Sequence, residues 1–253
     1  MPSIRDLQGN QLYFDDVGQG WPMIWIHPPG MGRKAFTYQH PLASDYRLIM
    51  PDLSGHGDSD VREKKPSIDF YVQEINHLLT TLNISHAILC GYSCGGSIVM
   101  EFALQYPQKV KALVLSGGFP KVATWRLRKE FHLGMYCLEK SPELLAQMLC
   151  TSHFSEQLVR DNVRHHILKA DPDVWYHFYK ECLHHDCTDR LTELTMPILL
   201  LYGGRSNWIN AHARYFRVCE NARMVVIDDS FHQLPATHWH TFNSAIKQFA
   251  STL

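Results

Sequence analysis

The chain has 253 residues, a hydrophobic fraction of 45% and a formal net charge of -1. This length is enough for one large α/β domain, or for one domain with an insertion, and for a sizeable buried core. The near-neutral balance argues against nucleic acid or an anionic membrane as a partner. No apolar run approaches the roughly 18 residues that a membrane span requires. Residues 1–10 also lack the apolar core of a secretory leader.

The seven cysteines show no CxxC spacing, and several, such as Cys90 and Cys219, lie within apolar patterns. We interpret them as reduced thiols, which predicts a cytoplasmic location. The chain also contains 16 histidines, so its total charge is sensitive to pH between about 5 and 7.

Apolar runs of strand length alternate with amphipathic helical patterns along most of the chain. A helix is predicted from 68 to 82, with Ser67 as its N-cap, because its apolar residues recur at helical spacing. Further helices are predicted at Ser97–Tyr106 and Trp239–Ala250. Such alternation predicts a mostly parallel sheet that is flanked by helices on both faces. The predicted strands are Gln11–Asp16 (antiparallel), Met23–Ile26, Tyr46–Pro51, Ala87–Cys90, Val110–Ser116, Pro197–Tyr202 and Met224–Ile227.

The stretch from about 119 to 190 interrupts this alternation. It contains no clear strand, many aromatic residues and apolar residues at helical spacing. We therefore predict a core domain formed by 1–118 and 191–253, with a helical cap inserted at 119–190.

A Gly-x-Ser-x-Gly pattern, residues 91–95, lies between a predicted strand and a predicted helix. This context indicates a nucleophile elbow, in which Ser93 occupies a strained turn and the flanking glycines avoid collisions. A serine nucleophile requires a base. His232 follows the last predicted strand, where a loop can bring its ring over the end of the sheet.

Two more segments complete a resemblance to the α/β-hydrolase superfamily. His27-Pro28-Pro29-Gly30 resembles the oxyanion loop of that family, and residues 52–59 (DLSGHGDS) resemble its D-x-R-G-H-G-x-S turn, with Ser54 in place of arginine. The resemblance covers the chain outside the cap, and it implies this fold and the Ser93–His232 pair. It does not specify a substrate, because the fold hosts many activities.

The sequence departs from this family at the acid of the triad. Ser206 occupies the position where the resemblance predicts an aspartate, with Asn207 beside it, and the turn after Val110–Ser116 also contains no acid. We therefore expect Ser206 or Asn207 to accept a hydrogen bond from His232 without supplying a charge. Alternatively, Asp228 or an aspartate of the cap supplies the acid, or the site has lost hydrolytic activity.

The oxyanion loop is the second departure. By resemblance, one oxyanion donor is the Cys94 N–H. Pro28 and Pro29 have no N–H, so the second donor should be Gly30 or Met31.

The substrate is predicted to be a small apolar acyl compound, because the cap is rich in aromatic residues. No metal or cofactor is predicted: the paired histidines at 165–166 and 184–185 point to different sides of a helix, and no phosphate-binding glycine motif is present. The oligomeric state is not predicted. The residues that we expect to contact substrate are His27, Pro29, Tyr92, Trp125, Trp175 and Phe231.

These features predict a carboxylic-ester hydrolase that forms an acyl-enzyme on Ser93, and thioesters, lactones or a C–C bond beside a ketone would use the same machinery. One alternative is a non-hydrolytic ligand-binding protein of signalling function, which the missing acid favours. Another is a cofactor-free haloperoxidase-like activity.

Overall fold

The computed structural model describes residues 2–6 and 8–253. Met1 and Leu7, which belong to the segment examined for a leader, lie outside the described residues. The described part contains an eight-stranded sheet with the order β1-β2-β4-β3-β5-β6-β7-β8. Its strands are β1 (Ser3–Arg5), β2 (Gln11–Val17), β3 (Trp21–Ile26), β4 (Tyr46–Pro51), β5 (Ala87–Tyr92), β6 (Val110–Ser116), β7 (Ile198–Gly203) and β8 (Ala222–Ile227).

The sheet is mostly parallel, as predicted. Strands β3 to β8 pair in parallel, whereas β2 pairs antiparallel with β4 and β1 pairs antiparallel with β2. The seven predicted strands are all present, and β1 was not predicted because it has only three residues. The parallel arrangement brings the carboxyl ends of β3, β5, β6 and β7 to one edge, where ligands bind in open α/β sheets.

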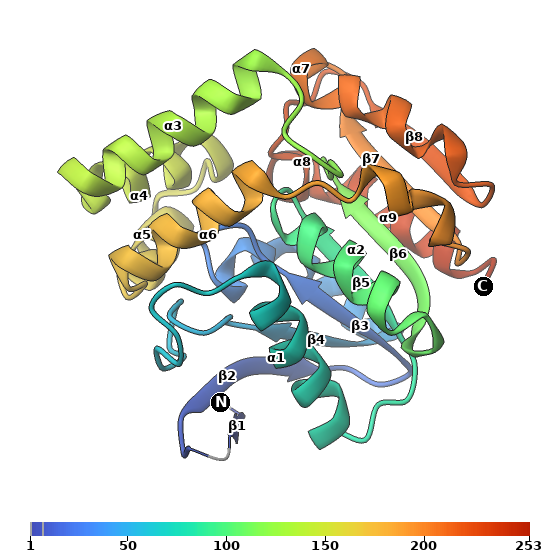
Figure 1. The fold of residues 1–253 in the computed structure, drawn as a ribbon, viewed down its shortest axis with the longest axis horizontal. Helices are drawn as coiled ribbons and strands as arrows, with labels where there is room; N and C mark the ends of the chain where they lie inside the picture. Colours follow the sequence, from blue (N-terminus) through green and yellow to red (C-terminus); the bar gives the residue numbers. More distant parts are fainter. Residues whose placement is uncertain (1, 7) are drawn as a thin grey trace.

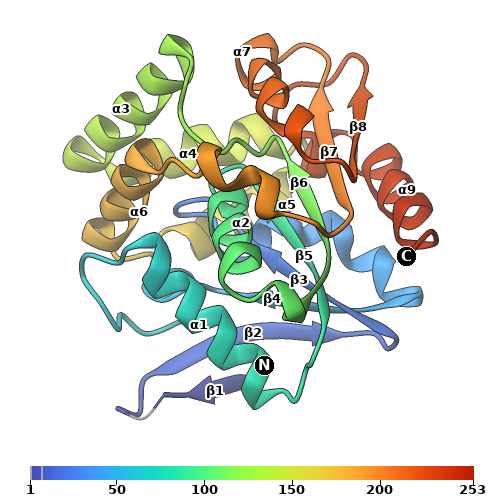
Figure 2. The ribbon, with the colours of Figure 1, turned by 45° about the vertical axis from the view of Figure 1, so that its right-hand side comes forward.

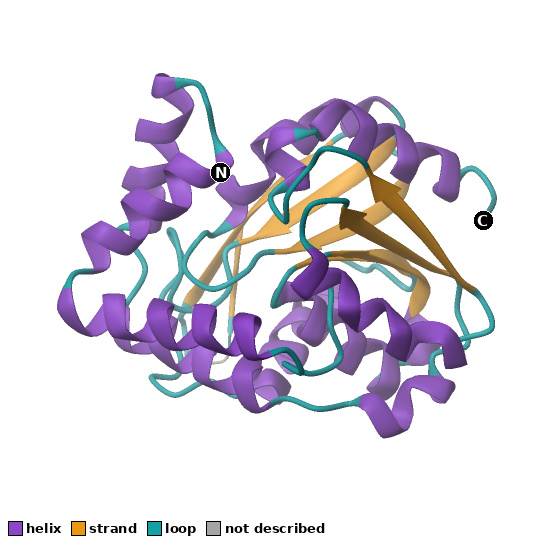
Figure 3. Cartoon of the chain, turned by 90° about the horizontal axis from the view of Figure 1, so that it is seen from above, coloured by secondary structure: helices purple, strands orange, loops and turns teal. Residues whose placement is uncertain are grey.

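Helices cover both faces of the sheet (Figures 1 and 3). Ser67 accepts a hydrogen bond from the Phe70 N–H and caps α1, as predicted. The helices of the core are α1 (Ile68–Thr81), α2 (Gly95–Gln105), α7 (Asn207–Asn210), α8 (Leu234–Thr237) and α9 (Trp239–Ala250), together with the 3₁₀ segments η1 (Arg33–Ser44), η2 (Pro107–Lys109), η3 (Thr188–Glu193) and η4 (Ala211–Val218).

The central strands are apolar at consecutive positions because both of their faces are buried. Ile24 and Ile26 of β3 pack with the residues of α1 and α2. Met23 and Trp25, which alternate with them, pack on the opposite face with Phe36 of η1 and with α9. This burial on both faces explains why strand MIWI contains no polar residue.

Four helices lie between β6 and β7, where the sequence predicted an insertion. They gather beyond the carboxyl ends of the strands, on the left in Figure 1, and Figure 2 shows them from the side. Whether they form a separate cap with the boundaries 119 and 190 stays a prediction. These helices are α3 (Trp125–Lys140), α4 (Pro142–His153), α5 (Gln157–Ile167) and α6 (Pro172–His184).

All seven cysteines are buried, and their thiols are free. Among the described residues, no helix combines the length and the apolar character that are needed to cross a membrane.

Candidate active site

Ser93 lies at the turn between β5 and α2, with a positive φ of 53°. This conformation is uncommon for a residue with a side chain. The glycines on either side permit it: a Cβ on Gly91 would lie 2.6 Å from the Gly96 Cα, and one on Gly95 would lie 2.1 Å from the Ile26 carbonyl oxygen. The turn therefore requires glycine at both positions, which is the physical reason for the Gly-x-Ser-x-Gly pattern.

His232 lies over this turn, although it is 139 residues away along the chain. Its Nε2 lies 2.9 Å from the Ser93 Oγ, within hydrogen-bonding distance. Burial, with a smaller contribution from nearby His153, lowers the pKa of His232 to about 3. The imidazole is therefore neutral at physiological pH, which is the state that can accept the serine proton.

The other ring nitrogen of His232, Nδ1, is buried and has no hydrogen-bond partner among the described residues. Ser206 is fully buried at the start of α7, but its Oγ also has no partner, and the Asn207 side chain is exposed. The prediction that Ser206 or Asn207 accepts a hydrogen bond from His232 therefore disagrees with this geometry. The reason is that the turn after β7 holds Ser206 by its backbone, through its N–H to the Gly203 carbonyl.

The turn after β6 does not supply an acid either. Gly117 has a φ of 57°, and a Cβ at this position would lie 2.4 Å from both Cε1 and Nδ1 of His232. The imidazole thus lies directly against this backbone, and no side chain fits there. Asp228 and Asp229 are also unsuited to the role, because both are exposed and Asp229 pairs with Arg205.

The missing acceptor has a chemical consequence. For His232 Nε2 to accept a proton from Ser93, Nδ1 must carry the other proton, and that N–H would have no acceptor among the described residues. An acidic third residue normally fixes this tautomer and stabilises the imidazolium that forms. Without it, no partner among the described residues holds the tautomer of His232, and an imidazolium at this position would have no neighbouring negative charge to stabilise it.

The Cys94 N–H is the first predicted oxyanion donor, and Cys94 lines the same cavity as Ser93. For the second donor the two candidates differ. Met31 lines the cavity, but its N–H donates to the Pro28 carbonyl in a turn. Gly30, at the third position of that turn with a φ of 83°, is absent from the residues that line the cavity. Neither candidate therefore combines a free N–H with a place in the cavity wall.

Ser93 and His232 open into a cavity of about 310 Å³. Part of its wall comes from helices α3, α4 and α6, and most of these residues are apolar. Among the described residues of the lining, Glu130 is the one carboxylate; burial raises its pKa above the ordinary value, although Trp208 donates a hydrogen bond to it. The lining from these helices comprises Leu127, Glu130, Phe131, Leu133, Gly134, Leu145, Met148, Leu149, Ser152, His153 and Tyr179.

Of the six residues that were predicted to contact substrate, two line the cavity and four do not. Pro29 and Tyr92 line the cavity. Trp125 is 69% exposed beside Lys129, and Phe231 is 49% exposed beneath Arg205, so neither reaches it. An aromatic side chain in the cap sequence does not reveal on which side of its helix the cavity lies.

Trp175 and His27 have structural roles instead. A Cβ on Gly30 would lie 2.1 Å from the Trp175 ring, so this indole packs directly on the oxyanion loop. His27 is fully buried; its Nδ1 donates to the Pro28 carbonyl at 2.9 Å and its Nε2 accepts the Leu53 N–H at 3.0 Å. Both side chains hold the loop in place rather than contact a ligand in the cavity.

Sequence reasoning missed a polar pair at the cavity wall. The Tyr92 hydroxyl donates to Nε2 of His153 at 2.8 Å, because the His153 Nδ1 donates to the Leu149 carbonyl at 2.7 Å. Tyr92 also lies against His232, with ring centroids 5.4 Å apart. This bond connects α4 to β5, the strand that leads into Ser93. Only the tertiary structure places a histidine from 61 residues away beside this tyrosine.

The D-x-S-G-H-G-D-S segment, residues 52–59, contributes to a cluster of ion pairs. Arg33 pairs with Asp52 and with Asp58, and His166 approaches Asp52 at 2.9 Å. Although burial opposes ionisation, the hydrogen bond from His166 and the charge of Arg33 hold the pKa of Asp52 at about 2. The carboxylates and the imidazole lie close enough to hold a metal ion, but both carboxylates already pair with cationic side chains, Asp52 with Arg33 and Asp58 with Arg33 and Lys169.

Comparisons with known proteins agree with this architecture. The alpha/beta hydrolase fold family matches residues 23–134. An uncharacterized protein of Mycobacterium tuberculosis is 35% identical over 121 residues, which cover 47% of this chain and 36% of that protein. The chain thus spans about a third of the length of that relative.

Two other proteins match over nearly the full chain. An AB hydrolase superfamily protein of Bacillus subtilis, YisY, is 25% identical over 95% of this chain and 96% of its own length. The solved structure of an esterase from Exiguobacterium antarcticum superposes with a TM-score of 0.88 at 19% identity, with 98% of each chain covered. The chain has the α/β-hydrolase fold, and the match to the family model together with these similarities supports the α/β-hydrolase superfamily.

Proposed function

We propose that this protein is a carboxylesterase-like hydrolase in which Ser93 is the nucleophile and His232 the general base. The observation that carries the proposal is the distance of 2.9 Å between the Ser93 Oγ and the His232 Nε2 at the wall of an apolar cavity. A serine at a strained elbow, within hydrogen-bonding reach of a neutral imidazole, is the arrangement that nucleophilic acyl transfer requires. The superfamily and the similarity to the esterase from Exiguobacterium antarcticum are consistent with it.

The reaction would consist of two successive acyl transfers, first to Ser93 and then to water. The Ser93 Oγ attacks the acyl carbon while its proton passes to the His232 Nε2, and the Cys94 N–H stabilises the oxyanion. The tetrahedral intermediate then collapses, the bond to the leaving alcohol breaks, and that alcohol takes the proton from His232. Water repeats the sequence on the acyl-enzyme, with His232 again accepting and returning a proton, and it releases the carboxylic acid.

The cavity favours a small apolar acyl group. A volume of about 310 Å³ lies at the lower end of the range for ligand pockets, and Leu127, Phe131, Leu145 and Met148 supply an apolar wall. Esters with short acyl chains are therefore the proposed substrates, with thioesters and lactones as chemically related candidates. The helices between β6 and β7, about 119–190, would act as the cap that defines this specificity.

One observation favours a second function, non-hydrolytic ligand binding. Among the described residues the His232 Nδ1 has no acceptor, so the pair lacks the charge that stabilises an imidazolium. A protein that retained the cavity but lost the acid would bind a small apolar ligand and turn over no substrate.

Steady-state hydrolysis of p-nitrophenyl esters with acyl chains of increasing length distinguishes the two functions. The hydrolase proposal predicts multiple turnovers on short esters by the wild type, and none above background by Ser93→Ala. A matched control is Ser97→Ala, which alters a buried serine of α2 outside the cavity lining and should retain activity. Ester hydrolysis that persists in Ser93→Ala would overturn the proposal, and an absence of turnover by the wild type across the panel would favour ligand binding.

A further inference from the structure

The two connections to the cap lie side by side at its neck. Lys121 forms a β-bridge with Asp186, and the Cys187 N–H donates to the Pro120 carbonyl at 3.1 Å. The chain therefore enters and leaves the cap at one place, next to α2. This neck is the region in which a ligand could fix the position of the cap relative to the core.

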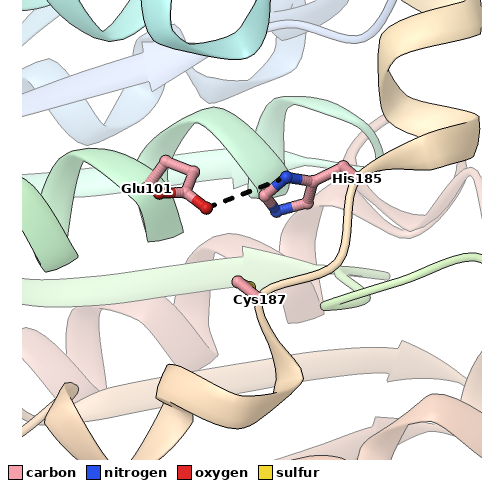
Figure 4. A group of neighbouring side chains, drawn as sticks. All are labelled: Glu101, His185 and Cys187. Carbon is pink, nitrogen blue, oxygen red and sulfur yellow. Dashed lines mark ion pairs between the residues drawn. The ribbon is translucent and has the colours of Figure 1, made fainter.

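Three potential metal ligands meet at this neck (Figure 4). Glu101 projects from α2, and His185 and Cys187 follow α6. One ligand atom from each residue lies within 4.8 Å of the other two. The side chains of Glu101 and His185 are only 11% and 8% exposed, and Cys187 is fully buried.

The backbone brings His185 and Cys187 to the same side. Helix α6 ends at His184, and His185 has the extended conformation, with φ -61° and ψ 134°. In extended backbone, residues two apart face the same way. The sequence-based argument that adjacent histidines of a helix point to different sides therefore does not apply to His185, because the helix has already ended.

One of these groups lacks a partner. His185 Nε2 is buried and has no hydrogen bond among the described residues, and its Nδ1 lies 3.8 Å from the Glu101 Oε1, too far for a good hydrogen bond. A buried polar atom without a partner costs about 1–3 kcal/mol. Coordination to a metal ion would satisfy this nitrogen.

The donor set and its surroundings suit a zinc-like ion. Thiolate sulfur, imidazole nitrogen and carboxylate oxygen are the donors that Zn²⁺ prefers. Glu101 and His185 also line a cavity of about 280 Å³ whose other lining includes the carboxylates of Asp69 and Glu181. This acidic cavity provides an approach for a cation.

The cluster differs from the Asp52–Asp58–His166 group in the position of its arginine. There, Arg33 is almost fully buried between the carboxylates. Here, the Arg190 side chain is 44% exposed and contacts Oε1 of Glu101, the same oxygen that lies 3.8 Å from the His185 Nδ1. An ion at this site would therefore bind Oε2 of Glu101, or bind Oε1 after the exposed Arg190 side chain has moved away.

We propose that Glu101, His185 and Cys187 form a binding site for Zn²⁺ or a similar divalent transition-metal ion at the neck of the cap. The Glu101 carboxylate, the His185 imidazole and the Cys187 thiolate each donate an electron pair to the ion, and the thiol proton is released to solvent. The ion connects α2, which follows the nucleophile, to the segment that leaves the cap. The site is structural and separate from Ser93 and His232.

Titration of the metal-free, reduced protein with Co²⁺, followed by its absorption spectrum, tests this proposal. Co²⁺ bound by a thiolate gives a sulfur-to-metal charge-transfer band, which reports Cys187 directly. We expect one equivalent of Co²⁺ to produce this band and Zn²⁺ to displace it. The band should disappear in Cys187→Ser, and the affinity should fall at least about tenfold in His185→Gln.

Two control variants test whether the effect is specific to the proposed ligands. Cys219→Ser removes another buried thiol, which donates to the Leu191 carbonyl. His184→Gln removes the neighbouring exposed imidazole, which lines the same cavity. Both variants should retain the charge-transfer band. If Cys187→Ser does not fold, His185→Gln decides, because the Nε2 of His185 makes no hydrogen bond to lose. A wild type without the band, a band retained in Cys187→Ser, or an unchanged affinity in His185→Gln would overturn the proposal.

Discussion

The carboxyl ends of β5 and β7 lie at the same edge of the sheet, but they contribute unequally to the site. The turn after β5 supplies Ser93 in a strained conformation, 2.9 Å from the His232 Nε2. The turn after β7, where the superfamily resemblance predicts an acid, supplies Ser206 and Asn207, and neither bonds to His232. The two nitrogens of the imidazole therefore differ: among the described residues, Nε2 has a hydrogen-bond partner and Nδ1 has none.

The two turns differ because backbone packing dictates the residues of the first, whereas only catalysis would require an acid in the second. Gly91 and Gly95 are required because a Cβ at either position would collide with neighbouring backbone. No comparable collision enforces an acid after β7, since Ser206 fits there fully buried. A charged third residue can thus be absent while the fold and the elbow remain intact.

Replacing the base should have the largest effect. In His232→Ala, kcat/KM for a short-chain ester should fall by about 10²–10⁴, because the proton of Ser93 loses its acceptor. Steady-state kinetics measure this change. His153→Ala provides a control, as it removes another buried imidazole of the cavity wall that does not contact Ser93. Equal losses in the two variants would contradict the assignment of His232 as the base.

Placing a carboxylate after β7 should give the His232 Nδ1 a hydrogen-bond acceptor. In Ser206→Asp, a carboxylate at the buried position should hold the proton on Nδ1 and stabilise the imidazolium, raising kcat about tenfold. Asn207→Asp adds the same charge at the exposed neighbouring position and should leave kcat unchanged. A folded Ser206→Asp enzyme with a lower kcat than the wild type would show that this position does not reach His232.

Two substitutions in α3 compare its cavity-facing side with its exposed side. Phe131 lines the cavity, whereas Trp125 of the same helix is 69% exposed. Phe131→Ala should lower kcat/KM for the best apolar ester about tenfold, because binding area for the acyl group is lost. Trp125→Ala should leave it unchanged. Both variants are measured with the same ester. Equal losses of kcat/KM in the two would show that the substrate does not bind against Phe131.

The smallest expected effect is the response to pH. His232 must be neutral to accept a proton, and burial lowers its pKa to about 3. Its neutral form therefore persists below the ordinary histidine pKa of about 6.5, and kcat/KM should change less than about twofold between pH 8 and 5. Ser206→Asp should shift the acidic limb upward, since a nearby carboxylate favours the imidazolium. A wild-type limb near pH 6.5 would contradict this assignment.

Most of the fold could be predicted from the sequence because its signals are local. Runs such as MIWI and PILLLY are continuous because both faces of the sheet are buried, and Ser67 caps α1 through its own side chain. The Ser93–His232 pair could be anticipated because the elbow and the last loop have fixed places in the fold.

The rest depended on distances between remote segments. No local pattern shows that His153 bonds to Tyr92, that Trp175 packs on Gly30, or that Trp125 faces away from the cavity. Helical spacing also misplaced His185, because the end of α6 lies one residue earlier than the paired histidines suggested.

The most direct test of the central claim is the intact mass of the protein after exposure to a fluorophosphonate. This reagent reacts with a serine whose hydroxyl is activated by a base. We predict a single stoichiometric adduct on the wild type and none on Ser93→Ala. A wild type that forms no adduct at long times, or an adduct that persists in Ser93→Ala, would contradict an activated Ser93.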